Sequence, residues 1–360
     1  MSRLRVAVLM GGRSAEREVS LSTGRQALAA LDPEKYEAFG VDPAHLGARA
    51  EAGGLPPPSE DAFAGSLVPI QALLNPTTRP DVALICLHGR YGEDGAIQGL
   101  LELLGIPYTG SDVLGSALAM NKPRAKAVFQ RHGIPTPRWT EVLGAAEAAD
   151  YLRGGFESPG APTLPAIVKP ANQGSTIGMT VARTAEELAP ALETALAYDR
   201  EVLIEEFVSG TEITAAVLGS APPDVLPLVE IIPASGFYDY QAKYTPGATK
   251  EIVPARLPDS TAATARELAL RSHRALGCRA LSRVDMIIAD GGIQVLEVNT
   301  IPGMTPTSLL PRAAAAAGIA FPELLDRLLE LALQPGSADL DGEPRIETDA
   351  ASGAQECELQ

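Results

Sequence analysis

The sequence of 360 residues lacks the features that mark several common protein classes. Its three cysteines, Cys86, Cys278 and Cys357, form no CxxC pair and are odd in number, which excludes a cysteine-based zinc framework and favours a reducing compartment. No apolar run approaches the roughly 20 residues that span a bilayer. The apolar segment 4–10 is too short for a signal peptide. We therefore expect a cytoplasmic protein with no membrane partner.

Basic residues are also scarce. Lys and Arg number 29 against 45 Asp and Glu, which gives a formal charge of −16, and no Lys/Arg-rich face is visible that could neutralise the phosphates of a nucleic acid. The glycine turn after the first apolar segment lacks the GxGxxG spacing of a dinucleotide site, and no GxxxxGK[ST] P-loop occurs. A nucleic-acid partner and a dinucleotide-dependent oxidoreductase are therefore both disfavoured.

The strongest functional signal lies in one predicted hairpin. Segments 283–288 and 296–301 flank an Asp-Gly-Gly turn and have the pattern of two antiparallel strands. Glu297 and Asn299 are two residues apart, so both point to one face of their strand, and Asp285 could join them there. Such an all-oxygen set suits a hard divalent cation that also holds phosphates. A half-exposed hairpin with outward polar residues is the alternative.

The chain begins with the pattern of a doubly wound α/β domain. Residues 4–10 read as a buried parallel strand, followed by a glycine turn at 11–16 and a helix. A second apolar strand, 82–87, leads into His88. Ligands of open α/β sheets collect at the carboxyl ends of strands, where both Glu16 and His88 are expected. For His88 alone, a hydrogen-bonded loop histidine is the alternative.

Two segments further along could contact a nucleotide. Asn121-Lys122-Pro123 has the composition of a helix start, and we expect a domain boundary there. The strand 166–170 contains Lys169 and precedes a Gly/Ser loop at 171–179, which could fold over phosphates while the lysine supplies a point charge. Taken alone, the loop could also be a plain turn.

Three later segments add to this pattern. The strand 201–208 has acidic residues at its exit and could offer backbone groups to an adenine and a carboxylate to a ribose, although a solvated sheet edge is the alternative. Glu212, on the next strand, could face the same cleft. The aromatic loop 235–247 is typical of a lid.

Beyond residue 334, seven acidic residues stand against Arg345 alone, and we expect this tail to be disordered.

The order of these motifs resembles the D-alanine:D-alanine ligases of the ATP-grasp superfamily over residues 4–334. The motifs that carry the resemblance are GGRSAEREVS (11–20), LHGRYGEDG (87–95), PYTGS (107–111), VKP (168–170), GSTIG (174–178), FYDY (237–240), AKY (242–244) and LEVNTIPGM (296–304).

This resemblance implies an α/β protein, α+β in its ATP-binding part, with an ATP-grasp fold and an N-terminal doubly wound α/β domain. The implied domains are 1–121 for binding the first D-alanine, 122–215 as the central ATP-grasp subdomain, 216–334 with the metal site and lid, and 335–360 as the acidic tail. The implied reaction joins two D-alanines through a D-alanyl phosphate at the expense of ATP, releasing ADP and phosphate, for peptidoglycan synthesis. Two Mg²⁺ or Mn²⁺ ions and a homodimer are also implied.

The resemblance assigns roles to individual residues. The metal ligands would be Asp285, Glu297 and Asn299. The ATP-binding residues would be Lys122, Lys169, Ser175, Glu205, Glu206, Phe207, Val208, Glu212 and Lys243. The substrate-binding residues would be Glu16 for the ammonium of the first D-alanine, His88 near its carboxylate, Arg283 and Gly303 at the oxyanion, and Ser308 at the second carboxylate. Ser175 and Tyr244 would join Glu16 by hydrogen bonds that hold the lid shut.

Other functions remain open at this point. A ligase that accepts D-lactate or D-serine as second substrate is the nearest, and Lys243-Tyr244 favours D-alanine over it. A carboxylate–amine ligase for different amino acids is disfavoured by the motifs around Glu16 and His88. A non-catalytic ATP-binding regulator of the same fold would be expected to lack a metal ligand or Arg283, whereas the sequence retains all of them.

Overall fold

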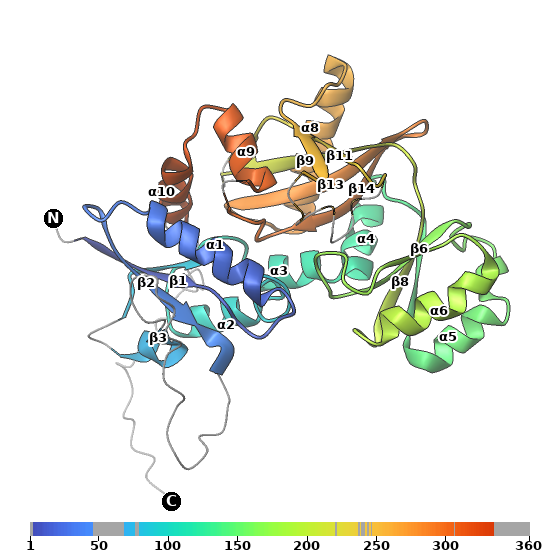
Figure 1. Ribbon diagram of the computed structural model, residues 1–360, viewed down its shortest axis with the longest axis horizontal. Helices are drawn as coiled ribbons and strands as arrows, with labels where there is room; N and C mark the ends of the chain where they lie inside the picture. The colour runs from blue at the N-terminus through green and yellow to red at the C-terminus, as the bar shows by residue number, and fades with distance from the viewer. Residues whose placement is uncertain are drawn as a thin grey trace, which may run out of the picture.

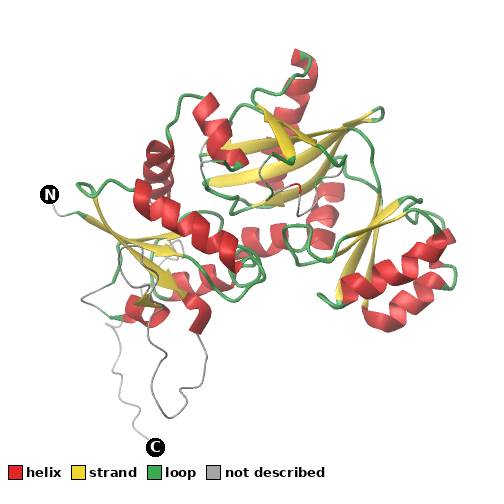
Figure 2. Cartoon of the chain, viewed as in Figure 1, coloured by secondary structure: helices red, strands yellow, loops and turns green. Residues whose placement is uncertain are grey.

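The chain forms three lobes, each built around its own sheet (Figures 1 and 2). The computed structural model describes residues 3–45, 68–75, 79–219, 222–236, 247–305 and 307–334, with positions 238, 242 and 245. Within these residues helices and sheets alternate in the N-terminal lobe and antiparallel sheets follow, which confirms the predicted fold class. The tail 335–360 lies outside the described residues, so its disorder stays a prediction.

The N-terminal lobe is a parallel sheet between helices. Its strands, in the order β3-β2-β1-β4, are β1 (Leu4–Leu9), β2 (Tyr36–Asp42), β3 (Val68–Pro69) and β4 (Val82–Ile85). Strands β1 and β4 are apolar throughout their buried parts because helices cover both faces of the sheet. These helices are α1 (Arg17–Ala30) and α2 (Ala96–Leu103), with short 3-10 turns η1 (Pro43–His45) and η2 (Ile70–Leu74).

Two helices connect this lobe to the rest. Helix α3 (Val113–Met120) is capped by Asp112, whose carboxylate accepts from the Gly115 N–H at 2.8 Å. Helix α4 (Lys122–Arg131) starts as the sequence predicted, because the Asn121 side chain accepts from the Arg124 N–H at 3.0 Å and a proline occupies the first turn.

The central lobe is a four-stranded antiparallel sheet covered on one face. Its strands, in the order β5-β8-β6-β7, are β5 (Trp139–Leu143), β6 (Ala166–Pro170), β7 (Thr180–Ala182) and β8 (Glu201–Glu206). Helices α5 (Gly144–Leu152) and α6 (Ala185–Leu196), with η3 (Gly155–Glu157), lie together beside it. Val168, Val202 and Ile204 join the core beneath the helices. Strand alternation leaves Lys169 and Glu205 on the opposite face.

The C-terminal lobe contains a six-stranded antiparallel sheet. Its strands are β9 (Thr211–Leu218), β10 (Asp224–Val225), β11 (Val229–Pro233), β12 (Thr249–Ile252), β13 (Leu281–Ala289) and β14 (Gly292–Asn299), in the order β12-β11-β9-β13-β14 with β10 beside β9. The predicted hairpin is therefore correct. The predicted domain boundary at residue 215 falls inside β9, an inner strand of this sheet, so the division of the chain into domains stays a prediction.

Helices cover this sheet and bring it against the N-terminal lobe. Helix α8 (Asp259–Ala275) shares a core with α4 through Phe129, Ala265 and Leu268. Helices α9 (Leu309–Ala316) and α10 (Phe321–Ala332) complete the chain, and α10 packs beside α1 (Figure 1) in a core that includes Leu21 and Leu324. Helices α9 and α10 thus join the C-terminal lobe to the N-terminal lobe.

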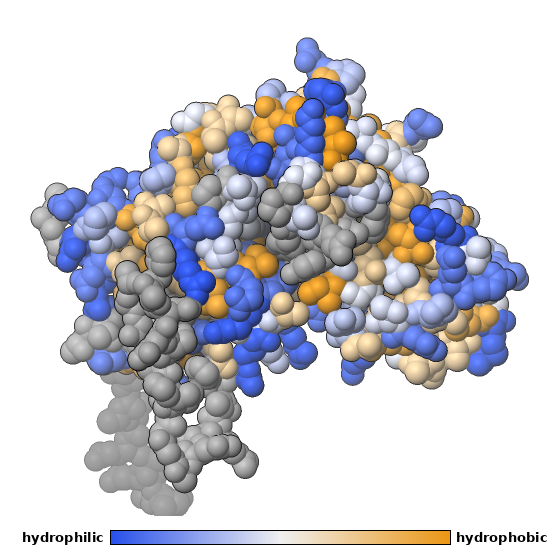
Figure 3. All heavy atoms as spheres, in the orientation of Figure 1, coloured by the Kyte–Doolittle hydropathy of each residue, from blue (hydrophilic) through white to orange (hydrophobic). Residues whose placement is uncertain are grey.

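Among the helices that the structure describes, none combines the length and apolar character needed to cross a membrane. In the space-filling view, hydrophobic side chains on the visible face occur in separate groups among hydrophilic ones (Figure 3).

Acid is expected to destabilise the fold through His273 of α8. Its Nδ1 lies 2.8 Å from the Ser282 hydroxyl oxygen, and burial, with Arg274 adding to the effect, lowers its pKa to about 4. The pKa of His273 in the folded protein lies below its pKa of about 6.5 in the unfolded chain. The neutral imidazole therefore contributes its full stabilisation above about pH 6.5, and this stabilisation is lost as the pH falls toward the folded pKa. Wild type should therefore lose about 2 kcal/mol more unfolding free energy between pH 7.5 and pH 5 than His273→Asn does.

Urea titrations of both proteins at the two pH values measure this difference. Asparagine keeps a polar group near Ser282 without a titratable ring. Equal losses in the two proteins would contradict the assignment to His273.

Candidate active site

Two adjoining cavities lie where the three lobes meet. The first, of about 440 Å³, has walls from all three lobes; the second, of about 610 Å³, lies between the central sheet and the C-terminal sheet. The residues common to both are Lys122, Gly174, Ser175, Tyr238 and Glu297. All of the predicted site residues that the structure describes line one cavity or the other, including Glu16, His88, Arg283, Gly303 and Ser308 in the first.

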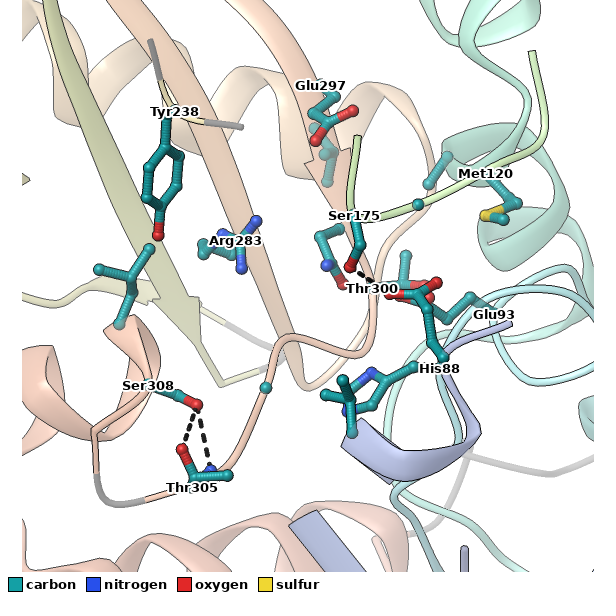
Figure 4. A pocket seen from close by; sticks show the side chains of 18 of the residues that line it. His88, Glu93, Met120, Ser175, Tyr238, Arg283, Glu297, Thr300, Thr305 and Ser308 are labelled. Atoms are coloured by element: carbon teal, nitrogen blue, oxygen red, sulfur yellow. Dashed lines mark hydrogen bonds between the residues drawn. The ribbon is translucent and has the colours of Figure 1, made fainter. Parts of the chain in front are cut away.

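The β13–β14 hairpin presents a row of polar side chains to these cavities. Arg283 pairs in register with Asn299, and Asp285 pairs with Glu297, so the four side chains share one face of the sheet, as the sequence predicted for the acidic pair and the amide. Figure 4 shows Arg283 and Glu297 on this face. The arginine lies close to both the predicted metal ligands and the first cavity.

Arg283 and Asp285 form a two-pronged ion pair within one strand. The arginine Nε and Nη2 donate to the two carboxylate oxygens at 2.8 and 2.7 Å, and the Thr214 hydroxyl donates to Oδ1 at 2.6 Å. Burial alone would lower the pKa of Arg283, but the adjacent Asp285 carboxylate raises it above its ordinary value. The guanidinium is thus a fixed positive charge at the edge of the cavity.

The three predicted metal ligands can hold a Mg²⁺ ion only if oxygen atoms from outside the protein fill the rest of its coordination sphere. Within the described part of the chain, no group of three or more His, Cys, Asp or Glu side chains is arranged to hold a metal ion. Asp285 and Glu297 supply two carboxylates, and Asn299 adds an amide whose Oδ1 accepts from the Ile301 N–H at 2.9 Å. These residues fit a Mg²⁺ ion that takes its other ligands from phosphates and water.

Glu16 joins the N-terminal lobe to the Gly/Ser loop of the central lobe. It lies at the start of α1 with 7% of its surface exposed, and the Ser175 hydroxyl donates to its Oε1 (Figure 4). A Cβ at Gly174 or Gly89 would stand 2.7 Å from Glu16 Oε2, so both glycines permit the close approach. Ser175 has a φ of 49°, in the left-handed region.

His88 and Glu93 both line the first cavity (Figure 4). Burial, helped by Arg283, lowers the pKa of His88 to about 4, although a hydrogen bond from the imidazole to the Ile301 backbone opposes the shift. Its Nε2 lies 3.2 Å from the Thr23 hydroxyl oxygen. The imidazole is therefore neutral near pH 7 and acts as a hydrogen-bonding group rather than a cation.

Sequence reasoning did not select Glu93 as a site residue. Burial, and next the Glu16 carboxylate, raise its pKa to about 8, while a hydrogen bond from the Gly89 N–H at 2.5 Å opposes the shift. Glu93 belongs to the same glycine-rich motif as His88, and this shared motif is the feature of the sequence that could have identified it as a site residue. Two neighbouring buried carboxyl groups favour a state in which one of them carries a proton.

Lysines and carboxylates also face each other in the second cavity. Lys122 Nζ donates to the Gln173 carbonyl oxygen at 2.6 Å and lies 3.7 Å from Glu297 Oε2. Lys169 Nζ donates to Glu205 Oε1 at 3.0 Å. The remaining predicted nucleotide contacts that line this cavity are Ser175, Glu206, Phe207, Val208 and Glu212.

The side chain of Glu206 has partners of its own. Arg138 donates to both of its carboxylate oxygens at 3.0 Å, and the Thr163 hydroxyl donates at 2.8 Å. These contacts hold the pKa of Glu206 below its ordinary value. A nucleotide contact from this residue would therefore use its backbone.

Ser308 and Gly303 meet at the opposite end of the first cavity. The Ser308 hydroxyl oxygen accepts from the Thr305 N–H at 3.1 Å and lies 2.8 Å from the Thr305 hydroxyl oxygen (Figure 4). A Cβ at Gly303 would stand 2.9 Å from Ser308 Oγ. This end of the cavity offers hydroxyl groups at the start of α9, a position that suits a carboxylate.

The predicted lid residues Lys243 and Tyr244 lie outside the described residues. Tyr238 is described and lines both cavities. Burial raises the pKa of its hydroxyl above the ordinary value. The predicted roles of Lys243 and Tyr244 stay predictions.

A cleft between two antiparallel sheets, lined by lysines and carboxylates and closed at one end by the parallel-sheet lobe, is the architecture of an ATP-grasp protein. A family model described as D-ala D-ala ligase N-terminus matches residues 5–111, and one described as D-ala D-ala ligase C-terminus matches residues 128–330. The chain belongs to the D-alanine–D-alanine ligase family.

Individual relatives agree with this membership over at least 94% of their length. The D-alanine–D-alanine ligase of Syntrophobacter fumaroxidans is 49% identical over 92% of this chain and 98% of its own; that of Moorella thermoacetica is 46% identical over 92% and 100%. Among solved structures, the Bacillus anthracis ligase complexed with ATP has a TM-score of 0.71 at 34% identity, covering 92% of this chain and 97% of its own. The Coxiella burnetii ligase has a TM-score of 0.73 at 29% identity, covering 92% and 94%.

Gly174→Ala is expected to open the loop that contacts Glu16. The new Cβ would stand 2.7 Å from the Glu16 carboxylate, so the contact with Ser175 must lengthen. Backbone amides of residues 174–179 should exchange with solvent deuterium about tenfold faster than in wild type, as measured by hydrogen exchange and mass spectrometry.

Gly291→Ala is the matched control, since its Cβ would meet nothing within 4 Å and its φ is not in the left-handed region. Unchanged exchange of the loop in Gly174→Ala would show that the glycine is not required for the closed contact.

Proposed function

We propose that this protein joins two D-alanine molecules into D-alanyl-D-alanine with the cleavage of ATP to ADP and phosphate. The observation that carries the proposal is the shared face of Arg283, Asp285, Glu297 and Asn299 between two cavities of the sizes that two small substrates and a nucleotide require. The names of the relatives supply the amino acid. Peptidoglycan precursor synthesis is the process in which such a dipeptide is used.

ATP would occupy the second cavity. The Bacillus anthracis ligase, which has been solved in complex with ATP, supports this assignment. Lys122, Lys169 and the Ser175 loop would contact the phosphates, with Lys243 reaching them from the lid. The segment Glu205, Glu206, Phe207 and Val208 would surround the adenine, and Glu212 would accept from the ribose.

Two Mg²⁺ or Mn²⁺ ions would be held by Asp285, Glu297 and Asn299 together with the phosphates. When bound, such ions offset the negative charge on the phosphoryl group that is transferred. Asp285 now uses both oxygens for Arg283. Holding an ion would require this carboxylate to divide its contacts between the ion and the arginine.

The first D-alanine would lie between Glu16 and His88. Its ammonium would donate to the Glu16 carboxylate, and the neutral His88 would contact its carboxylate without adding charge. That carboxylate attacks the γ-phosphate, and the bond from phosphorus to the bridging oxygen of ADP breaks, which gives an acyl phosphate. Orientation and electrostatic stabilisation supply most of the rate in such a step.

The second D-alanine would bind through its carboxylate to Ser308. Its neutral amine attacks the acyl carbon, and the charged oxygen that develops is stabilised by Arg283 and the Gly303 N–H. Phosphate departs as the carbonyl reforms, and the proton that the nitrogen loses leaves with the phosphate. Glu16, Ser175 and Tyr244 would link the lid to the first amino acid. A closed lid excludes water, which would otherwise hydrolyse the acyl phosphate.

We further propose that the enzyme is a cytoplasmic homodimer without nucleic-acid or membrane partners, in keeping with its charge of −16. D-Lactate and D-serine are the alternative acceptors. A non-catalytic regulator is disfavoured because the metal ligands and Arg283 share one face of the hairpin.

Glu297→Gln tests the reaction and the metal site together. Glutamine is nearly isosteric but neutral, so phosphate release from Mg-ATP that requires D-alanine should fall by at least about 100-fold. Phosphate release is measured with D-alanine, L-alanine, D-serine or D-alanine plus D-lactate, and products are identified by mass.

Glu141→Gln, on β5, is the control and should retain activity. If D-lactate or D-serine is joined in preference to D-alanine near pH 7, the second substrate is different from the one proposed. If wild type binds ATP but turns over with none of these acids, the catalytic proposal is wrong.

Arg283→Lys tests the oxyanion role separately. Lysine keeps the positive charge but loses the two parallel hydrogen bonds to Asp285, so kcat should fall by about 100-fold or more. The KM for ATP should change much less, because Arg283 lines the first cavity and not the second. A rise in the KM for ATP with unchanged kcat would place the arginine's function at the nucleotide instead.

A further inference from the structure

Lys126 is a buried lysine that touches neither cavity. It lies on α4 four residues after Lys122, so both point to the same side of the helix. Lys122 lines both cavities, whereas Lys126 lines neither and only 1% of its surface is exposed. A lysine buried to this degree is costly unless a specific partner offsets the charge.

Its partner is the carboxylate of Glu205, which is also only 1% exposed. Lys126 Nζ contacts Glu205 Oε2 and donates to the Thr136 hydroxyl oxygen at 2.5 Å. The other carboxylate oxygen, Oε1, accepts from Lys169 at 3.0 Å. One carboxylate from β8 thus stands between two ammonium groups, one from α4 and one from β6.

The two lysines differ in what else they can reach. Lys169 lines the second cavity beside the Gly/Ser loop, whereas Lys126 contacts Glu205 without lining either cavity. Burial alone would raise the pKa of Glu205, but the two lysines together hold it below its ordinary value, Lys126 first. If Lys169 turned toward a phosphate, Glu205 would keep its charge partner in Lys126.

We propose that Lys126 is a positioning residue for the nucleotide: it holds Glu205 as a permanent counter-ion and thereby leaves Lys169 available to the phosphates of ATP. This inference rests on the proposed assignment of the second cavity to ATP. Without Lys126, the buried Glu205 carboxylate would have Lys169 as its remaining ammonium partner. Separating that pair would leave a buried charge uncompensated, so Lys169 would stay on Glu205 and bind phosphate poorly.

A purely structural role for Lys126 predicts a different result. A tether between α4 and β8 would lower the thermal stability when removed, without a selective effect on nucleotide affinity. A positioning role is therefore detected by the KM for ATP and the Kd of Mg-ADP. A purely structural role is detected by the melting temperature, with kcat as a check on the reaction itself.

Lys126→Met is the first test, since methionine keeps most of the length of the side chain and removes its charge. We expect the KM for ATP and the calorimetric Kd of Mg-ADP to rise about tenfold or more. The kcat at saturating ATP and the KM for D-alanine should stay within about twofold of wild type. Arg124→Met, an exposed cation of the same helix, is the control and should leave all four values unchanged.

A second pair of variants keeps the inference testable if Lys126→Met does not fold. In a Glu205→Gln background there is no carboxylate to hold Lys169, so adding Lys126→Met should leave the Kd of Mg-ADP unchanged. The double variant also contains no buried carboxylate without a partner, which favours folding.

Three results would overturn the inference. The first is an unchanged nucleotide affinity in Lys126→Met together with a lowered melting temperature. The second is a fall in kcat of Lys126→Met without a change in its KM for ATP. The third is a weaker binding of Mg-ADP when Lys126→Met is added to Glu205→Gln. Failure of the wild-type protein to bind Mg-ADP would instead overturn the assignment of the cavity to ATP, which distinguishes the two proposals.

Discussion

A charge buried in the cleft of this protein is stable only beside an opposite charge, and the arrangement around the cleft depends on that constraint. Asp285 is held by Arg283 on the same strand, and Glu205 by lysines from two other elements. Movement of α4 or β6 away from β8 would separate a buried pair. A nucleotide must therefore enter as a replacement partner, with its phosphate oxygens taking lysines that carboxylates now hold.

The same reasoning connects the two cavities. Glu16 belongs to the N-terminal lobe, yet its carboxylate accepts from Ser175, which lines both cavities. In the proposed reaction this carboxylate also receives the ammonium of the first amino acid. Loop closure over the phosphates and placement of the amino acid would then depend on one side chain, so an acyl phosphate would form mainly when the loop is closed to water.

Local patterns predicted a large part of this arrangement. The hairpin that carries Asp285 and Glu297 follows from alternation and a turn, and the start of α4 follows from Asn121 and a proline, because both depend on residues close in the sequence. The position of His88 follows from the rule that strands of a parallel sheet end at one edge. These predictions required no knowledge of how the lobes pack.

Residues whose role depends on contacts between lobes were not predictable in the same way. The pKa of Glu93 is raised by burial and by Glu16, which is 77 positions away in the chain. Burial lowers the pKa of Lys126 to about 8, where its side chain packs against Glu205 on a strand of another subdomain. In the sequence, Lys126 looks like an ordinary surface charge, and only its place in the glycine-rich motif of His88 marks Glu93. The free-energy cost of burying these side chains arises only when packing removes water from them. A charged side chain that is kept in the interior despite this cost indicates a partner residue whose position or charge depends on that side chain. For Lys126 that partner is Glu205, and through Glu205 it reaches the lysine that faces the nucleotide cavity.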